Sequence, residues 1–515
     1  MKRISLIVLS LVVFAISASA QLSEQQQIQK LNLVYQQIRN NYVDDVKLEP
    51  LVDEAIRATL HKLDPHSQYF TREEMERFRA RLQGKFAGIG IRYIMHNDTL
   101  VVRSVIPNSP ASRADIMSND RIVAVDNKNI VGIDIESVQK LLQGAADSKL
   151  SIEIIRRKEH KSLNVTIKRD YIESKGVSAS YRIGDVGYIA ISTFTKPLSS
   201  EIYSAYKALG DIKSLVVDLR DNGGGALTSG IDLSSMFLAK GDLIASTEGK
   251  TSSDTYFKKQ DRITITTPLV VIINENSASA SEIFAGAIQD HDRGVIVGRT
   301  SFGKALVQRI YDLKDGSGLV LSIAHYKTPS GRIIQRPYEM GKGDEYRKDK
   351  ARYMHPDSIP HDNELIFHTL HSGRKVYGGG GITPDIFIAP DSIALSQVII
   401  EAHNSAKFEH AIIDYLDIAD IDSLKKQHPT IEDFSKSYKL DGELSNIFNT
   451  YIGDVELTDI DKAFIECVLR SFVAEHIYGS DARYYIYSID FDHTLNQAIA
   501  IASNEELMQR TLTSH

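Results

Sequence analysis

Cysteine is almost absent from this sequence. Cys467 is the only cysteine among 515 residues, so no intramolecular disulfide can form. It lies in the apolar helical pattern FIECVLRSFV, without a neighbouring base or metal-binding side chain. That setting is typical of a buried small hydrophobic residue, and it predicts a structural role for Cys467.

An excess of positive charge is also missing. The chain holds 60 Lys and Arg against 67 Asp and Glu, for a net charge of -7. Domains that bind nucleic acid usually carry a basic stripe, so we expect no nucleic-acid partner. We also expect no metal and no cofactor, because paired metal-ligand spacing is missing at His61, His66, His355 and His361. The glycine run 378–381 lacks a following Lys-Ser or Lys-Thr and is typical of a flexible turn.

Long apolar runs are absent beyond the N-terminus. No later stretch approaches the roughly 20 apolar residues that span a bilayer, so no membrane anchor is expected in the mature chain. Lys2 and Arg3 precede an apolar run at 4–16, followed by small residues at 18–20. This pattern predicts a cleavable export signal at 1–20, and hence a periplasmic protein, with an extracellular one as the alternative. A buried first helix is the other interpretation.

The remaining chain changes character three times, and its length predicts about three or four domains. Residues 21–83 and 391–515 carry apolar positions at helical spacing. Residues 84–170 hold short β-type runs with two helical stretches. Residues 171–390 alternate apolar strands with helices, which predicts a largely parallel sheet covered by helices. The expected fold class is therefore α+β multidomain, with a hydrophilic exposed loop at 341–363.

One window combines the residue types that acyl-transfer chemistry needs. The apolar strand PLVVIIN runs into small residues at 277–281, and a helical pattern follows. A serine at such a turn lies at a helix N-terminus, where backbone amides favour developing negative charge. Serine needs a base, and the nearest candidate is Lys304, which could act once burial lowers its pKa. Taken alone, these residues are more typical of a helix-capping serine and a solvated lysine than of a catalytic pair.

The whole window, residues 274–308, resembles the signature of the C-terminal processing peptidases, also called tail-specific proteases. The middle serine of S-A-S-A-S-E is the nucleophile in that family, and it corresponds to Ser279. The family's dyad lysine corresponds to Lys304, 25 positions later, and Gln308 matches the glutamine that orients the lysine. The resemblance implies a serine endopeptidase with a Ser–Lys dyad and an α/β core of the ClpP/crotonase type.

Two other segments resemble parts of the same family. The segment VVDLRDNGGGAL resembles the loop that supplies the oxyanion hole, which implies donors at the Gly224 and Ala280 amides. Residues 84–170 resemble a PDZ domain, whose carboxylate-binding loop would be Gly88, Ile89, Gly90 and Ile91. A PDZ domain captures a peptide C-terminus by strand addition, so the expected partners are proteins or peptides with a free C-terminus.

The sequence departs from the family pattern at four positions. Gly223 stands where proline is usual, and Ala305 replaces a glycine after the lysine. Asp115 and Asn119 replace glycines that are common in the PDZ region. None of these departures removes a chemical group from the predicted dyad.

Other functions remain open at this point. Asp290 and His291 suggest a Ser–His–Asp triad, yet both lie about 16 Å along the same predicted helix from Ser279. A binding protein that keeps the fold without cleavage is one alternative, and an esterase or amidase for small substrates is another. The resemblance also makes a homo-oligomer through the terminal helices plausible, whereas the role of 391–515 stays open.

Overall fold

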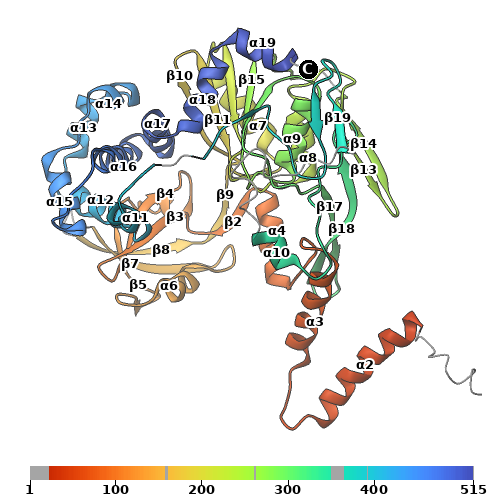
Figure 1. Cartoon of the computed structure of the whole chain (residues 1–515). Helices are drawn as coiled ribbons and strands as arrows, with labels where there is room; N and C mark the ends of the chain where they lie inside the picture. The colour runs from red at the N-terminus through yellow and green to blue at the C-terminus, as the bar shows by residue number, and fades with distance from the viewer. Residues whose placement is uncertain (1–22, 157–160, 260–262, 349–364, 391–392, 514–515) are drawn as a thin grey trace, which may run out of the picture.

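The computed structural model describes residues 23–156, 161–259, 263–348, 365–390 and 393–513 (Figure 1). The predicted export signal at 1–20 lies outside these residues, as does most of the loop predicted at 341–363. The described start of that loop forms a short helix, α10 (Gly343–Lys348), rather than an irregular segment. No helix of the described chain is both long and apolar enough to cross a bilayer.

The N-terminal part is helical, as its periodicity predicted. It contains α2 (Glu24–Asn41), α3 (Leu48–Leu63), the short strand β1 (Gln68–Phe70) and α4 (Arg72–Leu82). Thr71 caps α4 and forms a capping box with Glu74. Helix α2 projects away from the body and buries none of its residues (Figure 1).

The β-rich module, residues 84–170, folds around its own core. Its main sheet has the order β3-β4-β5-β7-β8, with β6 paired to β5. Two helices, α5 (Pro110–Arg113) and α6 (Ile135–Leu142), accompany the strands. The strands are β2 (Lys85–Gly88), β3 (Ile91–His96), β4 (Thr99–Val105), β5 (Arg121–Val125), β6 (Lys128–Asn129), β7 (Lys149–Arg156) and β8 (Lys161–Lys168). Strand β9 (Asp170–Glu173) pairs with β2 and leads into the next layer.

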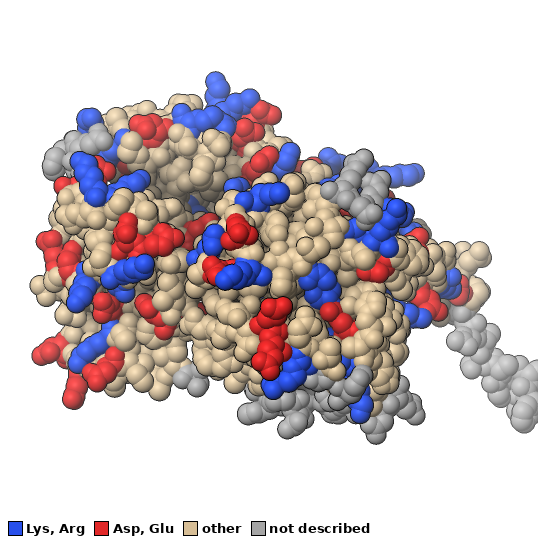
Figure 2. All heavy atoms as spheres, turned by 90° about the horizontal axis from the view of Figure 1, so that it is seen from above, with Lys and Arg blue, Asp and Glu red and all other residues tan. Residues whose placement is uncertain are grey.

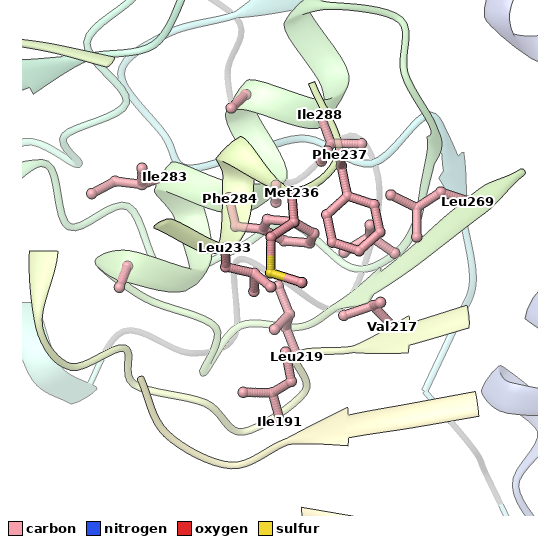
Figure 3. Close-up of a cluster of buried hydrophobic side chains, with 14 of the residues drawn as sticks. Ile191, Val217, Leu219, Leu233, Met236, Phe237, Leu269, Ile283, Phe284 and Ile288 are labelled. Carbon is pink, nitrogen blue, oxygen red and sulfur yellow. The ribbon is translucent and has the colours of Figure 1, made fainter. Parts of the chain in front are cut away.

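The central sheet has the order β10-β11-β12-β15-β16-β21. Strand β10 pairs antiparallel with β11, and every other pair of neighbouring strands in this sheet is parallel. Every residue of β11, β12, β15 and β16 is buried, because helices cover both faces. Helices α8 and α9 pack on one face, where Leu233, Phe284 and Val217 meet (Figure 3). Helix α18 packs on the other face through Leu495. The bounds are β10 (Val177–Ile183), β11 (Val186–Ile191), α7 (Leu198–Ala208), β12 (Ser214–Asp218), α8 (Leu227–Ser235), β15 (Leu269–Ile273), α9 (Ala280–Asp290), β16 (Val295–Gly298) and β21 (Ile386–Phe387).

A second, antiparallel sheet stands beside the central one and joins the N-terminal part to the core. Its order is β1-β18-β13-β14, and β17 also pairs with β18. Strand β1 therefore adds to the sheet that contains the segment after Lys304. The bounds are β13 (Leu243–Gly249), β14 (Ser253–Phe257), β17 (Leu306–Asp312) and β18 (Gly318–Lys327), and a separate hairpin holds β19 (Ile366–His368) and β20 (Lys375–Tyr377).

The C-terminal extension, residues 391–515, is helical where it is described, and it contacts both the β-rich module and the central sheet. Helices α16 and α12 share a core that includes the buried Cys467, while α18 and α19 reach the central sheet. Nearly buried Arg121 of the β-rich module pairs with Asp417 at 2.6 Å. The helices are α11 (Gln397–Asn404), α12 (Lys407–Ile418), α13 (Ile421–Gln427), α14 (Ile431–Ser437), α15 (Gly442–Ile452), α16 (Asp459–Tyr478), α17 (Ser480–Asp490), α18 (His493–Ala502) and α19 (Glu505–Thr513).

The surface agrees with the mild net charge. Basic and acidic side chains are interspersed over the face that Figure 2 shows.

Candidate active site

Ser279 occupies a strained turn between β15 and α9. It precedes the first residue of α9, and its backbone adopts φ 58° and ψ -113°. A residue with a Cβ rarely takes such angles, and strain of this kind concentrates at functional sites. The next amide, of Ala280, has no acceptor within the described chain and lies at the positive end of the buried helix α9. The turn therefore presents a serine hydroxyl beside a free backbone donor.

Lys304 lies in the loop between β16 and β17. Its Nζ donates to Gln308 Oε1 at 2.9 Å. Burial lowers the pKa of Lys304 below its ordinary value, although the carboxylates of Glu282 and Asp64 oppose this effect. Among the described residues, no hydrogen bond joins Lys304 Nζ to Ser279 Oγ. Catalytic hydrogen bonds are often unmade without substrate, and the lowered pKa suits a lysine that must become neutral.

Glu282 joins the two loops through one buried carboxylate. Its Oε2 accepts the amides of Ser279 at 2.8 Å and Lys304 at 2.9 Å. Its Oε1 accepts Ser301 Oγ and the Gly303 amide, both at 2.6 Å. Burial raises the pKa of Glu282, and these four hydrogen bonds oppose the rise. Sequence reasoning missed this residue, although the Ser-x-x-Glu spacing of a capping box was a signal for it.

Gln308 is held at both ends of its amide. Oε1 accepts from Lys304, and Nε2 donates to the backbone carbonyl of His66 at 2.7 Å. The structure thus brings Ser279, Lys304 and Gln308 into one region, together with a segment that lies 242 positions from Gln308. Sequence reasoning found no chemical role for residues 21–83, and no motif in that segment signalled this contact.

The glycine loop after β12 lies against the turn that carries Ser279. Gly224 has φ +95°, and a Cβ there would lie 2.6 Å from Ala278 O and 2.9 Å from Ala280 N. Only glycine fits this approach. The Gly224 amide donates to Asn222 Oδ1 at 2.8 Å, so it must change partner before it can bind an oxyanion. The structure places Gly224 and Ala280 side by side, with Ala280 as the donor that is free at present.

The four departures from the family pattern all fit their surroundings. A Cβ at Gly223 would meet no atom within 4 Å, so the position has room for a side chain and does not itself require glycine. Ala305 is fully buried, and its φ is not positive, so no glycine is required. Asp115 and Asn119 have φ values of 58° and 72°. Asp and Asn adopt this left-handed region more readily than other residues with a Cβ, which explains why they can replace glycine.

The proposed carboxylate loop lies in the β-rich module, between β2 and β3. Gly88 ends β2, Ile91 begins β3, and Ile89 and Gly90 form the connection. The carbonyls of Ile89 and Gly90 accept the amides of Ala111 and Ile106, whereas their own amides donate to no described group. Because β3 is an edge strand of its sheet, an added peptide strand could pair with it.

The alternative triad is not assembled. Asp290 pairs at 2.6 Å with Arg332, and both side chains are fully buried. His291 Nε2 lies 2.7 Å from the Leu243 carbonyl oxygen. Both residues are therefore engaged at the far end of α9 from Ser279. No cluster of metal-ligating side chains occurs in the described parts of the chain.

Comparison with known proteins gives three family matches along the chain. Residues 185–341 match peptidase family S41, residues 101–156 match a PDZ domain, and residues 13–74 match the activating protease CtpB N-terminal domain.

Curated relatives agree with these matches. The carboxy-terminal-processing protease of Bartonella bacilliformis is 36% identical over 337 residues, covering 63% of this chain and 77% of the relative. The carboxy-terminal processing protease CtpA of Bacillus subtilis is 31% identical over 310 residues, covering 60% of this chain and 66% of the relative. Among solved structures, the photosystem II D1 C-terminal processing protease is 24% identical, with a TM-score of 0.34, covering 70% of this chain and 86% of that one.

Proposed function

This chain belongs to the carboxy-terminal processing proteases of peptidase family S41, which makes it a serine-type peptidase, and we propose that it cuts proteins near a free C-terminus with Ser279 and Lys304. The observation that carries the assignment is the buried Glu282 carboxylate, which binds the backbone amides of both residues. The strained backbone of Ser279 and the lowered pKa of Lys304 support it further.

The reaction follows from these positions. Neutral Lys304 takes the hydroxyl proton as Ser279 Oγ attacks the peptide carbonyl carbon. The amide of Ala280 donates to the oxyanion, and the Gly224 amide joins it after leaving Asn222. Lys304 then gives its proton to the leaving amine, which leaves an acyl group on Ser279. Lys304 takes a proton from the water that attacks this ester, and it returns the proton to Ser279 Oγ as the carboxyl product leaves, so both side chains regain their starting state.

Substrate selection rests on the β-rich module. The free amides of Ile89 and Gly90 would bind the substrate's terminal carboxylate, with Gly88 and Ile91 flanking them. The rest of the tail would pair with the edge strand β3. We therefore expect a peptide with a free apolar C-terminus to be cut faster than the same peptide amidated.

Location and assembly complete the proposal. The basic, apolar and small residues of 1–20 support export to the periplasm, where envelope proteins would be processed or degraded. Helix α2 exposes Ile28, Leu31 and Val34, which supports a homo-oligomer that covers this apolar face with a second copy.

The test is cleavage of an unfolded protein with an apolar C-terminal tail, followed by intact mass. Wild type is expected to give tail-proximal fragments, and Ser279→Ala and Lys304→Ala to give none. The matched controls are Ser235→Ala on α8 and Lys213→Ala on the surface, which are expected to cleave normally. Cleavage by Lys304→Ala at the wild-type rate would refute the dyad. A wild type that binds the tail but neither cleaves it nor reacts with a serine-directed reagent would instead be a binding protein.

A further inference from the structure

Gln308 can orient Lys304 only while its own amide is fixed. Lys304 Nζ donates to Oε1, so the opposite end, Nε2, needs an acceptor. That acceptor is the His66 carbonyl, at 2.7 Å. The two ends of an amide move together, so loss of this contact would free Oε1 as well. The position of one backbone carbonyl, outside the segment that matches the peptidase family, therefore determines how Gln308 contacts the base.

The His66 carbonyl is itself held by the turn Asp64–Ser67, which connects α3 to β1. Buried Asp64 accepts the amides of His66 at 2.8 Å and Ser67 at 2.7 Å through Oδ1, and its Oδ2 accepts Ser67 Oγ at 2.5 Å. This is an Asx-type turn, in which a side chain takes the place of backbone hydrogen bonds. The geometry of the turn therefore depends on the Asp64 side chain.

The turn is fastened to the strand beside Gln308. Ser322 of β18 donates its amide to Ser67 Oγ at 3.1 Å and its hydroxyl to Asp64 Oδ1 at 3.2 Å. Ser322 is also the register partner of Gln308 across β17 and β18. The contacts thus close a ring that runs from Gln308 through Ser322 and the turn to the His66 carbonyl and back to Gln308.

A ring contact fastens the same turn to the loop that carries Lys304. The His66 imidazole stands edge-on to Tyr346 of α10, with ring centroids 5.4 Å apart, and to Phe302, with centroids 6.2 Å apart. The Tyr346 hydroxyl also reaches the Gly303 carbonyl at 3.4 Å. Phe302, two residues before Lys304, is therefore packed against the turn, and Gly303 is bonded to Tyr346, which also contacts the turn.

We propose that the turn Asp64–Ser67 positions the catalytic base: it fixes Gln308, and through Gln308 it aims the Lys304 amine. The inference rests on the proposed Ser279–Lys304 dyad and extends it to a segment that no catalytic motif covers. Asp64 and Ser67 are positioning residues, since neither touches the reacting atoms.

The turn also acts on Lys304 through charge. Titratable and charged groups around the Lys304 loop are Glu282, Asp64, His66, Tyr326, Tyr346 and Arg336. Of these, the carboxylates of Glu282 and Asp64 raise the pKa of Lys304 against the lowering effect of burial. Removal of the Asp64 charge lowers this pKa further. Lysine then becomes neutral at a lower pH, so the acid limb of the activity profile moves to lower pH.

The experiment is a double-mutant cycle in the full chain, with kcat and KM measured on a quenched peptide that has a free C-terminus. The single variants are Asp64→Ala and Gln308→Ala, and the double variant combines them. On the high-pH plateau, where Lys304 is neutral throughout, we expect Asp64→Ala to lower kcat about 10-fold, part of the usual contribution of a positioned base. We expect KM to stay unchanged. We expect the kcat of the double variant to equal that of Gln308→Ala alone, because both changes act on one contact.

Conservative variants separate the effect of the turn's geometry from the effect of the Asp64 charge. Asp64→Asn keeps an oxygen for the His66 and Ser67 amides, so it retains plateau kcat while its acid limb moves to lower pH. Ser67→Ala keeps the charge but loosens the turn, so it lowers kcat without that charge effect, and it serves if Asp64→Ala fails to fold. The matched control is Asp53→Asn on α3, which removes a carboxylate charge but keeps an oxygen that accepts the Tyr69 hydroxyl, and it leaves both kcat and the acid limb unchanged.

The outcomes are distinguishable from those of the dyad test. Additive losses in the double variant would show that the turn supports only the fold, and they would overturn this inference while the dyad stands. Wild-type kcat in both Asp64→Ala and Ser67→Ala would do the same. Full activity of Lys304→Ala would overturn the dyad and this inference together.

Discussion

The replacement Glu282→Gln tests whether one carboxylate holds the loops of Ser279 and Lys304 in place. Both oxygens of Glu282 accept hydrogen bonds, and each of them accepts at least one backbone amide. Glutamine can present an oxygen on one side only. Its NH₂ group must therefore face either the Gly303 amide or the amides of Ser279 and Lys304, and none of these can turn into an acceptor.

The expected loss of stability depends on how many donors are left without an acceptor. The better orientation turns the NH₂ group toward Ser301 and Gly303, because the Ser301 hydroxyl can reverse its role. One buried backbone amide is still left without a partner, which costs about 1–3 kcal/mol. Glu282→Ala leaves four donors unpaired, so the same figures give a loss of about 4 kcal/mol or more. We expect kcat of Glu282→Gln to fall roughly 10- to 100-fold, because a small misplacement of reacting groups has effects of that size.

Two measurements check this prediction. Urea unfolding in the Ser279→Ala background, where self-cleavage is absent, gives the change in the free energy of unfolding. Peptide cleavage by the active chain gives kcat. Glu201→Gln is the matched control, because Glu201 accepts the amides of Gly176 and Val177 through a single oxygen that glutamine retains. Wild-type stability and kcat in Glu282→Gln would refute the reasoning.

Two further predictions concern the glycine loop and the contact between domains. Gly224→Ala should lower kcat by roughly 100-fold or more, because its Cβ would press against the turn that carries Ser279. The Cβ of Gly223→Ala would meet only open space, so this variant should cleave normally, and peptide cleavage rates decide between these outcomes. Arg121→Ala removes the cationic partner of Asp417 at a nearly buried contact, while Asn119 still donates to this carboxylate, and the change should cost about 3 kcal/mol in urea unfolding. The control is Arg113→Ala, which breaks an exposed pair with Asp170. Equal losses of stability in both arginine variants would contradict the prediction.

Local patterns predicted most of the elements. Apolar, β-branched runs separated by helical periods became the parallel sheet β11-β12-β15-β16 with its helices, because burial on both faces leaves a strand no polar positions. The small residues before α9 likewise predicted a serine at a helix N-terminus, where Ser279 lies. The prediction of an irregular loop at 341–363 was wrong at its start. Helix α10 forms there, where Tyr346 packs against His66, and this contact joins distant segments.

The sequence by itself therefore determined the order of strands and helices, and its resemblance to the family motif led to the proposed pair Ser279 and Lys304. Spacing along the chain decides these features, since covalent geometry sets helix and strand periods. Only the tertiary structure decided that Glu282 joins both loops, that the Gly224 amide is engaged, and that the turn Asp64–Ser67 reaches Gln308. The physical reason is that such contacts depend on strand pairing and helix packing between segments up to 258 positions apart, which no local pattern encodes.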